Sequence, residues 1–294
     1  MRLHVRCPAK INLHLQVLGR RPDGYHELRT LFAAVGVWDD LWFEEGPAGT
    51  VELTVEPAGA VPDGSDNLAV KAARALSEKM GRERGARIAL RKQIPVAGGL
   101  GGGSANAAAA LVGLVKLWGL SLEPSDLLSV AGSIGADVPF FLVGGVAWGV
   151  GRGSEVMPVR DLPPWWVVLV PGPNPVPTAE VYRALNIGAL DGEADVEIYR
   201  WVEKGGELPI GRFRNDLQPM VVRRWPEVTE RLRRVNDTRP LLAMLSGSGG
   251  TVFGLYRGED EATRAAEFLA AFRPLAAPIL TREASVLRPS AAEG

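Results

Sequence analysis

A lysine, an aspartate and a run of glycines are the residues of this chain whose types and positions could do chemistry. Lys10 and Asn12 lie two residues apart in a segment that alternates polar and apolar residues, as a strand does. Alternate strand residues are roughly 6.6 Å apart, so both side chains could reach one ligand. Asp137 lies in a turn before an apolar run, where a carboxylate could accept a proton. The ordinary alternatives are a solvated strand face for Lys10 and a turn or helix cap for Asp137.

The most informative segment lies between Lys92 and Lys116, which are separated by no charged side chain. Its centre reads Pro95, Val96, Ala97, Gly98, Gly99, Leu100, Gly101, Gly102, Gly103, Ser104 and Ala105. A Gly-rich turn that enters a helix directs several free N–H groups at one point, backed by the helix dipole. We therefore predict that the loop binds phosphate without a cation of its own. A side chain at Gly101 or Gly102 would then crowd the phosphate and forbid a positive φ.

Two familiar phosphate loops do not match this segment. A Walker A loop requires Gly-Lys followed by Ser or Thr, and the sequence contains no Gly-Lys dipeptide. The dinucleotide pattern G-x-G-x-x-G fails because the sixth residue counted from Gly99 is Ser104. A flexible linker is disfavoured because a disordered segment would not need Leu100 or the apolar helix that follows it.

Composition limits the function classes. The 294 residues are 46% hydrophobic and 23% charged with a net charge of −1, which argues against nonspecific nucleic-acid binding. The single cysteine, Cys7, excludes an internal disulfide and fits a reducing compartment, and the three histidines are not at metal-ligand spacing. No signal peptide or membrane-spanning run is visible. We expect a soluble, cytoplasmic enzyme or binding protein with no nucleic-acid and no membrane partner.

Periodicity and turn residues predict mixed strands and helices in both halves of the chain. The Gly/Pro-rich stretch from 151 to 164 predicts a domain boundary near residue 160. The polar face of the first strand comprises Lys10, Asn12, His14 and Gln16. We expect strands at 10–17, 87–93, 165–170 and 251–256. We expect helices at 68–80, after the Gly-rich loop, from 124 to 135, and at 178–186, 195–204, 215–235 and 260–272. The tail at 288–294 is expected to fray.

Three segments resemble, in order, the three motifs of the GHMP kinase family, which includes galactokinase and the homoserine, mevalonate and phosphomevalonate kinases. These segments are 8–13, 95–105 and 245–249. Four further segments resemble the family members that act on a cytidine diphosphate-linked methylerythritol: 24–28, 66–68, 135–141 and 215–217. The resemblance covers nearly the whole chain. One departure is Ala105, where the family often has a second serine after Ser104.

The resemblance implies an α/β (α+β) fold of two domains with the active site in the cleft between them. Residues 1–160 would form an ATP-binding domain similar to domain 2 of ribosomal protein S5. Residues 161–294 would form a ferredoxin-like domain on the substrate side. The implied activity is ATP-dependent phosphorylation of the 2-hydroxyl of that methylerythritol, a step of non-mevalonate isoprenoid precursor biosynthesis, with Mg²⁺ as cofactor.

Residue roles also follow from the resemblance. Asp137 would accept the proton of the substrate hydroxyl, and Lys10 would keep that carboxylate ionised and stabilise the developing alkoxide. The whole loop from Pro95 to Ala105 would bind ATP, and Asn67 would lie near its base. The implied substrate-binding residues are Asn12, Tyr25, His26, Thr178 and Tyr182. The small-molecule substrate is the implied partner, for a monomer or weak homodimer.

Other interpretations stay open at this point. Tyr25 and His26 could be an aromatic cover on the core, and the cluster 246–250 could be a plain hairpin turn. The chain could be a GHMP kinase for another small alcohol, such as homoserine or mevalonate, although Tyr25 and His26 speak against that. It could also be an inactive member that senses nucleotide, which the presence of both Lys10 and Asp137 disfavours.

Overall fold

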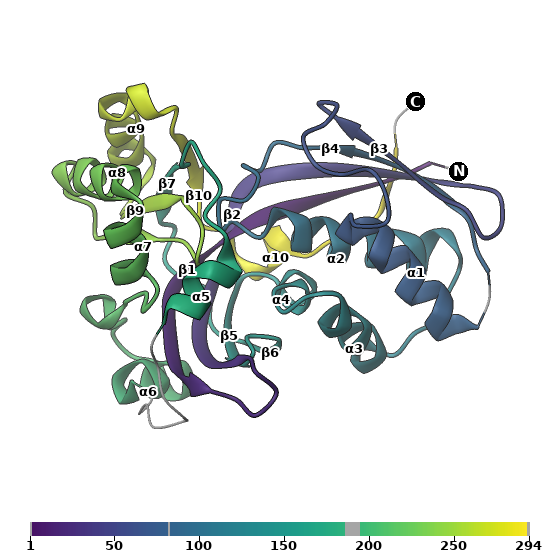
Figure 1. The fold of residues 1–294 in the computed structure, drawn as a ribbon, viewed down its shortest axis with the longest axis horizontal. Coiled ribbons are helices and arrows are strands. Elements are labelled where there is room, and N and C mark those ends of the chain that lie inside the picture. The colour runs from purple at the N-terminus through teal and green to yellow at the C-terminus, as the bar shows by residue number, and fades with distance from the viewer. Residues whose placement is uncertain (1, 82, 186–194, 293–294) are drawn as a thin grey trace.

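Two β-sheets organise the chain in a computed structural model that describes residues 2–81, 83–185 and 195–292 (Figure 1). The larger sheet has the order β11-β1-β2-β4-β3, with β5 paired to β2 and β6 paired to β5. All its pairs are antiparallel except the parallel pair β3–β4. Its strands are β1 (Leu3–Arg20), β2 (His26–Glu45), β3 (Val51–Glu56), β4 (Ala86–Arg91), β5 (Val146–Gly151), β6 (Glu155–Pro158) and β11 (Ser290–Ala291).

Strands β1 and β2 form one long hairpin that runs from the larger sheet toward the second half of the chain (Figure 1). The predicted strand at 10–17 is the middle of β1, so the alternation marks only part of the element. The β1–β2 register shifts between Pro8 and Ala9, between Asn12 and His14, and between Val17 and Gly19. Such irregularities bend a strand and redirect its side chains.

Four helices cover one face of the larger sheet (Figure 1). They are α1 (Leu68–Met80), α2 (Gly102–Leu117), α3 (Pro124–Ile134) and α4 (Val138–Val143). The bounds predicted for α1 are confirmed, because Asn67 caps its first turn and Gly81 ends it in the left-handed conformation. Helix α2 lies close to the sheet because its small residues are buried. A Cβ on Gly113 would lie 2.5 Å from the ring of Phe43 on β2.

The smaller sheet has the order β10-β7-β9-β8, with helices packed beside it (Figure 1). Its strands are β7 (Trp166–Val170), β8 (Leu242–Leu245), β9 (Val252–Tyr256) and β10 (Leu275–Pro278). The helices of this half are α5 (Thr178–Ala184), α6 (Val196–Lys204), η1 (Ile210–Arg212), α7 (Gln218–Arg224), α8 (Pro226–Asp237), α9 (Glu259–Phe268) and η2 (Ala270–Phe272). The helix predicted at 178–186 corresponds to α5. The last position of the predicted range, residue 186, lies outside the described residues.

Two predicted elements are wrong in detail. The single helix expected at 215–235 is divided into α7 and α8, because Pro226 has no N–H and forces Trp225 out of the helical conformation. The tail expected to fray instead contributes β11, which pairs with the start of β1 after the short helix α10 (Arg282–Ser285).

The mixed α/β architecture with two sheets is confirmed. The division at residue 160 stays a prediction, and one boundary does not describe the return of β11 to the larger sheet. No helix within the described ranges is long and apolar enough to cross a membrane.

Candidate active site

A cavity of about 940 Å³ lies where the β1–β2 hairpin, the Gly-rich loop, the start of α4, α5 and the β8–β9 turn meet. All seven residues predicted for substrate binding and catalysis line it. The side chains and backbone that line it are Lys10, Asn12, Leu15, Arg20, Gly24, Tyr25, His26, Leu28, Thr30, Phe32, Gly99, Gly101, Ala136, Asp137, Arg152, Gly153, Thr178, Ala179, Tyr182, Arg183, Leu185, Gly247 and Ser248.

Lys10 and Asp137, which are 127 positions apart in the sequence (137 − 10), form an ion pair in this cavity. The Lys10 Nζ lies 3.3 Å from the Asp137 Oδ2, and the side chains are 4% and 34% exposed. Asp137 occupies the N-cap position of α4, but its side chain makes no capping hydrogen bond. A buried cation thus faces a carboxylate that is open to the cavity, an arrangement that can deprotonate and stabilise a bound hydroxyl.

Asn12 is fixed beside this pair. Its Oδ1 accepts a hydrogen bond from the Lys10 Nζ at 2.7 Å, and its Nδ2 donates to the Thr30 Oγ1 at 2.8 Å. The Thr30 hydroxyl in turn donates to the His14 carbonyl oxygen at 2.8 Å. Because each polar group in this series of hydrogen bonds has a partner, the buried polar groups are satisfied and the Lys10 ammonium is held in place. A solvated strand face is therefore the wrong interpretation of Lys10.

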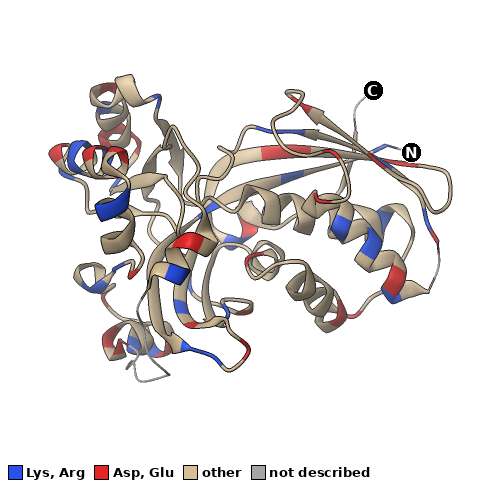
Figure 2. Ribbon diagram, viewed as in Figure 1, with Lys and Arg blue, Asp and Glu red and all other residues tan. Residues whose placement is uncertain are grey.

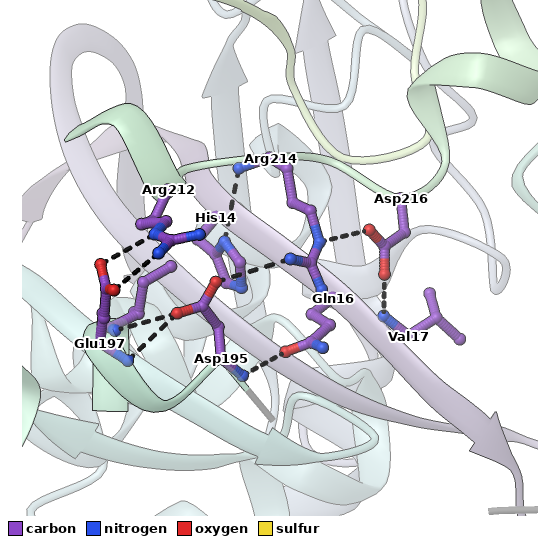
Figure 3. A network of polar contacts seen from close by, with 9 residues as sticks. His14, Gln16, Val17, Asp195, Glu197, Arg212, Arg214 and Asp216 are labelled. Atoms are coloured by element: carbon purple, nitrogen blue, oxygen red, sulfur yellow. Dashed lines mark hydrogen bonds and ion pairs between the residues drawn. The ribbon is translucent and has the colours of Figure 1, made fainter. Parts of the chain in front are cut away.

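The four polar residues expected to share one face of β1 do not act together. The register shift after Asn12 brings Leu15 to the cavity, whereas His14 and Gln16 do not line it. These two side chains contact the second half of the chain instead (Figure 3). The Arg214 N–H donates to the His14 Nδ1 at 3.4 Å, and the Asp195 N–H donates to the Gln16 Oε1 at 3.1 Å.

Charged residues complete this contact between the halves (Figure 3). The Val17 N–H donates to the Asp216 Oδ2 at 2.9 Å, and Arg214 pairs with both Asp216 and Asp195. Burial, and after it the positive charge of Arg214, lower the pKa of His14 to about 4. His14 is therefore neutral at pH 7, which suits an imidazole whose Nδ1 accepts a hydrogen bond.

Asn215 links the same segment to the third motif. Its Nδ2 donates to the carbonyl oxygens of Leu245 at 2.9 Å and Gly247 at 2.7 Å. Gly247 packs on Asn12 and Lys10, since a Cβ there would lie 3.3 Å from the Asn12 Oδ1 and 3.4 Å from the Lys10 Nζ. The Gly/Ser cluster is both a hairpin turn between β8 and β9 and a wall of the cavity.

The Gly-rich loop is held by backbone contacts on several sides. The Leu100 carbonyl accepts from the Lys10 N–H at 2.9 Å, and the Gly99 carbonyl accepts from the Ser246 hydroxyl at 2.9 Å. A Cβ on Gly98 would lie 2.4 Å from the Thr251 Oγ1, and one on Gly99 would lie 2.1 Å from the Ser246 carbonyl oxygen. Gly98 and Gly99 are thus required by the packing of the loop against the β8–β9 turn.

Different constraints act on the next glycines. Gly101 has a φ of +70° and precedes α2, whose first turn contains no acidic residue. Gly102 does not have a positive φ, so the expectation that a side chain there is forbidden by backbone conformation is wrong. A Cβ on Gly102 would instead lie 2.9 Å from the Lys92 Nζ. Gly103 is exposed, and a Cβ there would meet only the Leu68 Cδ1 at 3.4 Å.

Two observations bear on the role expected of the loop. Of the predicted segment 95–105, only Gly99 and Gly101 line the large cavity. The loop was also expected to lack a cation, but Lys92 places its ammonium beside Gly102. That ammonium is not free, because it pairs with the buried carboxylate of Asp39 and donates to the Asn106 Oδ1 at 3.2 Å.

Aromatic rings gather at the opposite end of the cavity. The His26 and Tyr182 rings are 5.1 Å apart, and the Tyr25 ring is 57% exposed with the Arg152 guanidinium 4.7 Å from its centroid. Burial raises the pKa of Tyr182, and the negative charge of Asp137 raises it further. Burial lowers the pKa of His26, as does the positive charge of Arg20. His26 therefore presents one donor and one acceptor at pH 7.

Thr178 and Asn67 have different positions relative to this cavity. The Thr178 Oγ1 lies 2.7 Å from the Ser248 Oγ, which joins the start of α5 to the β8–β9 turn. Asn67 does not line the cavity. Its Oδ1 accepts from the Ala69 N–H at 2.9 Å, and its Nδ2 donates to the Pro62 carbonyl oxygen at 2.7 Å. It therefore caps α1 and holds the preceding loop.

Sequence analysis missed three arginines that line the cavity near the aromatic rings: Arg20, Arg152 and Arg183. None of them forms an ion pair with a carboxylate in the described parts of the chain. The one available signal was the isolated cation in the turn 151–153, because nothing local distinguishes Arg20 or Arg183 from the other surface arginines. Figure 2 shows the contrast between the first turns of α2, where no residue is charged, and the charged β1–β2 turn and α5.

No group of three or more His, Cys, Asp or Glu side chains in residues 2–81, 83–185 and 195–292 is arranged to hold a metal ion. Among the described residues that line the cavity, Asp137 is the only carboxylate. Any divalent cation here would depend largely on oxygen atoms of a bound ligand, as Mg²⁺ does at many phosphate-transfer sites.

Comparisons with known proteins agree with this architecture. The family model for the GHMP kinases N terminal domain matches residues 67–145, and the model for the GHMP kinases C terminal matches residues 202–274. The 4-diphosphocytidyl-2-C-methyl-D-erythritol kinase of Pelotomaculum thermopropionicum is 44% identical over 260 residues, which cover 88% of this chain and 90% of that protein. The enzyme of the same name from Paramagnetospirillum magneticum is 42% identical over 271 residues, covering 92% and 94%.

Solved structures extend the comparison. A crystal structure of 4-(cytidine 5'-diphospho)-2C-methyl-D-erythritol kinase has a TM-score of 0.76 and 39% identity, covering 94% of this chain and 98% of that one. A homoserine kinase from Cytophaga hutchinsonii has a TM-score of 0.73 at 19% identity, covering 98% and 97%, which shows the shared fold. The predicted two-domain fold is confirmed, and the chain belongs to the GHMP kinase family, among the 4-diphosphocytidyl-2-C-methyl-D-erythritol kinases.

Proposed function

We propose that this protein transfers the γ-phosphoryl group of ATP to the 2-hydroxyl of 4-diphosphocytidyl-2-C-methyl-D-erythritol, in non-mevalonate isoprenoid precursor biosynthesis. The observation that carries the proposal is the pair of Lys10 and Asp137, 3.3 Å apart in the cavity that the Gly-rich loop and the aromatic residues share. The printed names of the relatives supply the acceptor. Phosphoryl transfer requires mainly positioning and charge stabilisation, which this geometry can provide.

In the proposed step, the acceptor oxygen forms a bond to the γ-phosphorus while the bond from that phosphorus to the β–γ bridging oxygen breaks. The hydroxyl proton passes to Asp137, and ADP leaves. Lys10 stabilises the negative charge that develops on the acceptor oxygen. Asn12, which is fixed by Lys10 and Thr30, orients that hydroxyl.

ATP is proposed to bind through the backbone of the loop from Pro95 to Ala105. The N–H groups of the first turn of α2 have no partners within the helix, and Ser104 adds a hydroxyl. Asn67 belongs to the nucleotide side through its neighbour Leu68, whose Cδ1 lies 3.4 Å from the position of a Cβ on Gly103. Mg²⁺ is included in the proposal as the ion that neutralises the phosphates of ATP, with Asp137 as the carboxylate available near it.

The acceptor is proposed to occupy the end of the cavity that contains the rings and arginines. Tyr25 and Tyr182 offer rings for a base to stack on, and His26 offers a donor and an acceptor for its edge. Thr178 lies beside them. Because the arginines outnumber the one carboxylate among the described lining residues, this end suits an acceptor that carries several negative charges, as a diphosphate does.

This charge pattern also bears on the alternatives. Homoserine and mevalonate carry at most one net negative charge and no base. They would therefore offer no group for the three arginines and the aromatic rings to bind. An inactive nucleotide sensor would have no need of the paired Lys10 and Asp137. The full proposal includes a cytoplasmic location, a monomer or weak homodimer and no nucleic-acid partner. The net charge of −1 supports the last of these.

A panel of acceptors tests the proposal. The purified protein is incubated with Mg-ATP and, separately, the cytidine acceptor, its uridine analogue, homoserine and mevalonate, and ADP release is followed. The expected result is ADP release with the cytidine acceptor and with none of the other three. A new phosphomonoester signal should then appear in ³¹P NMR. Faster turnover of homoserine or mevalonate would contradict the assigned substrate, and ATP binding without ADP release for any acceptor would favour the sensor.

A further inference from the structure

A buried carboxylate outside the cavity contacts both flanks of the Gly-rich loop. Asp39 lies in the middle of β2 and is 0% exposed. Its Oδ1 accepts hydrogen bonds from the backbone N–H groups of Gln93 at 2.7 Å and Ile94 at 2.9 Å, directly before the loop. Its Oδ2 accepts from the Lys92 ammonium and from the Asn106 Nδ2 at 2.8 Å, directly after the loop.

One side chain thus joins the entrance and the exit of the loop. Lys92 reinforces this connection, because its Nζ also donates to the Asn106 Oδ1 at 3.2 Å. The same ammonium borders the loop, since a Cβ on Gly102 would lie 2.9 Å from it. A fully buried carboxylate with four donors is fixed in orientation, so the residues that it binds are fixed relative to β2.

We propose that Asp39 is a positioning residue that holds the Gly-rich loop in the conformation that binds ATP. This inference rests on the proposed binding of ATP at the loop. Backbone N–H groups bind phosphate only when several of them converge, so a loop whose flanks shift relative to each other loses affinity even though its own sequence is unchanged. None of the four residues that donate to the Asp39 carboxylate lines the acceptor end, so we expect acceptor binding not to depend on it.

An ordinary structural ion pair would give a different result. Removing such a pair would lower the stability of the whole larger sheet. The affinities for ATP and for the acceptor would then either fall equally or both stay unchanged. A positioning role predicts a split between the two ligands. If the competent loop conformation falls to one tenth of the population, ATP affinity falls about tenfold, while the acceptor binds as before.

Calorimetric titration with a non-hydrolysable ATP analogue, and separately with the cytidine acceptor, measures that split. Asp39→Asn keeps an oxygen for the Gln93 and Ile94 N–H groups but directs an amide donor at Lys92 and Asn106. We expect its ATP affinity to fall about tenfold or more and its acceptor affinity to change less than about twofold. Asn106→Ala keeps both charges, so the same split should be smaller, about two- to fivefold.

Phe43→Leu is the matched control, because Phe43 lies on the same strand and packs on Gly113 in the second half of the same helix, away from the end that the loop enters. It should lower the melting temperature and leave both affinities unchanged. Wild-type ATP affinity in folded Asp39→Asn, or equal loss of both ligands, would overturn the inference. If Asp39→Asn does not fold, Asn106→Ala decides in the same way. Failure of the wild type to bind the ATP analogue would contradict the proposed function itself.

Discussion

The two ends of the cavity differ in the kind of chemical group that they offer to a ligand. The nucleotide end is made of backbone, and its nearest cation, Lys92, is already paired with Asp39. The acceptor end is made of side chains, namely aromatic rings and arginines that no described carboxylate pairs with. Backbone N–H groups recognise any phosphate of suitable shape, whereas rings and guanidinium groups can distinguish one small molecule from another. The comparison therefore assigns affinity for ATP to one end and choice of acceptor to the other.

The largest effect is expected where the two ends meet. Asp137→Asn and Lys10→Met should each lower kcat at least ~100-fold, because one removes the proton acceptor and the other removes the charge that stabilises the acceptor oxygen. Steady-state ADP release measures this loss, and calorimetry should show smaller changes in the affinities for both ligands. Asp126→Asn removes an exposed Lys–Asp pair elsewhere and serves as the control. Near wild-type turnover in either folded cavity variant would refute the catalytic assignment.

The next effect sharpens the acceptor end. Tyr25→Ala removes an exposed ring that the cytosine base is proposed to stack on, so KM for the acceptor should rise about 5- to 150-fold with KM for ATP unchanged. Tyr199→Ala is a matched control, because Tyr199 is also largely exposed, at 45%, and does not line the cavity. If the two tyrosine variants behaved alike, the base would not stack on Tyr25.

A smaller effect tests the nucleotide end. Gly103→Val adds a side chain at the first turn of α2 where the protein itself leaves room, so only a bound phosphate would be crowded. Loss of one hydrogen bond to a charged group should lower ATP affinity at least about tenfold, with acceptor affinity unchanged. Calorimetry with an ATP analogue measures both. Gly211→Val, where an added Cβ would meet nothing within 4 Å, is the control. Undiminished ATP binding by Gly103→Val would mean that the phosphates lie elsewhere.

The smallest effect concerns the charge at the acceptor end. Burial lowers the pKa of His26 below its ordinary value of 6.5, and Arg20 lowers it further. Arg20→Ala removes the second cause, so the titration midpoint of His26 should move to higher pH in NMR spectra. Because the unfolded chain takes up this proton first as pH falls, His26 contributes stability that is lost below pH 6.5. An unchanged midpoint would show that Arg20 does not contribute to the field at His26.

Local sequence predicted much of the fold and one end of the site. The capping residues of α1 and the glycines before α2 act on their neighbours, so their effects can be read from adjacent positions. Pro226 also predicts the break between α7 and α8, although it lies within a long amphipathic segment that by itself favours a single helix. Lys10 and Asp137 needed the family resemblance, because nothing in either local sequence indicates that they meet.

The remaining parts depend on contacts that no local pattern specifies. Arg20, Arg152 and Arg183 come from three separate segments and meet only because the β1–β2 hairpin lies against α5. Asp39 resembles its neighbour Asp40 in sequence, but the strand points the two side chains to opposite faces. The bend after Asn12 that redirects His14 and Gln16 depends on pairing with β2. Such arrangements are set by tertiary packing rather than by residue type.

The contact between the Gly-rich loop and the β8–β9 turn has a consequence for how the site is assembled. The Ser246 hydroxyl and the Gly99 carbonyl that it binds are 147 positions apart in the sequence. Bringing such distant segments together costs chain entropy, and the turn leaves the ribosome long after the loop. A growing chain therefore carries all the glycines of the Gly-rich loop before it has the partner that holds them. Competence to bind nucleotide arises only when both sheets have folded and docked, so bound ATP stabilises the finished molecule and not its first half.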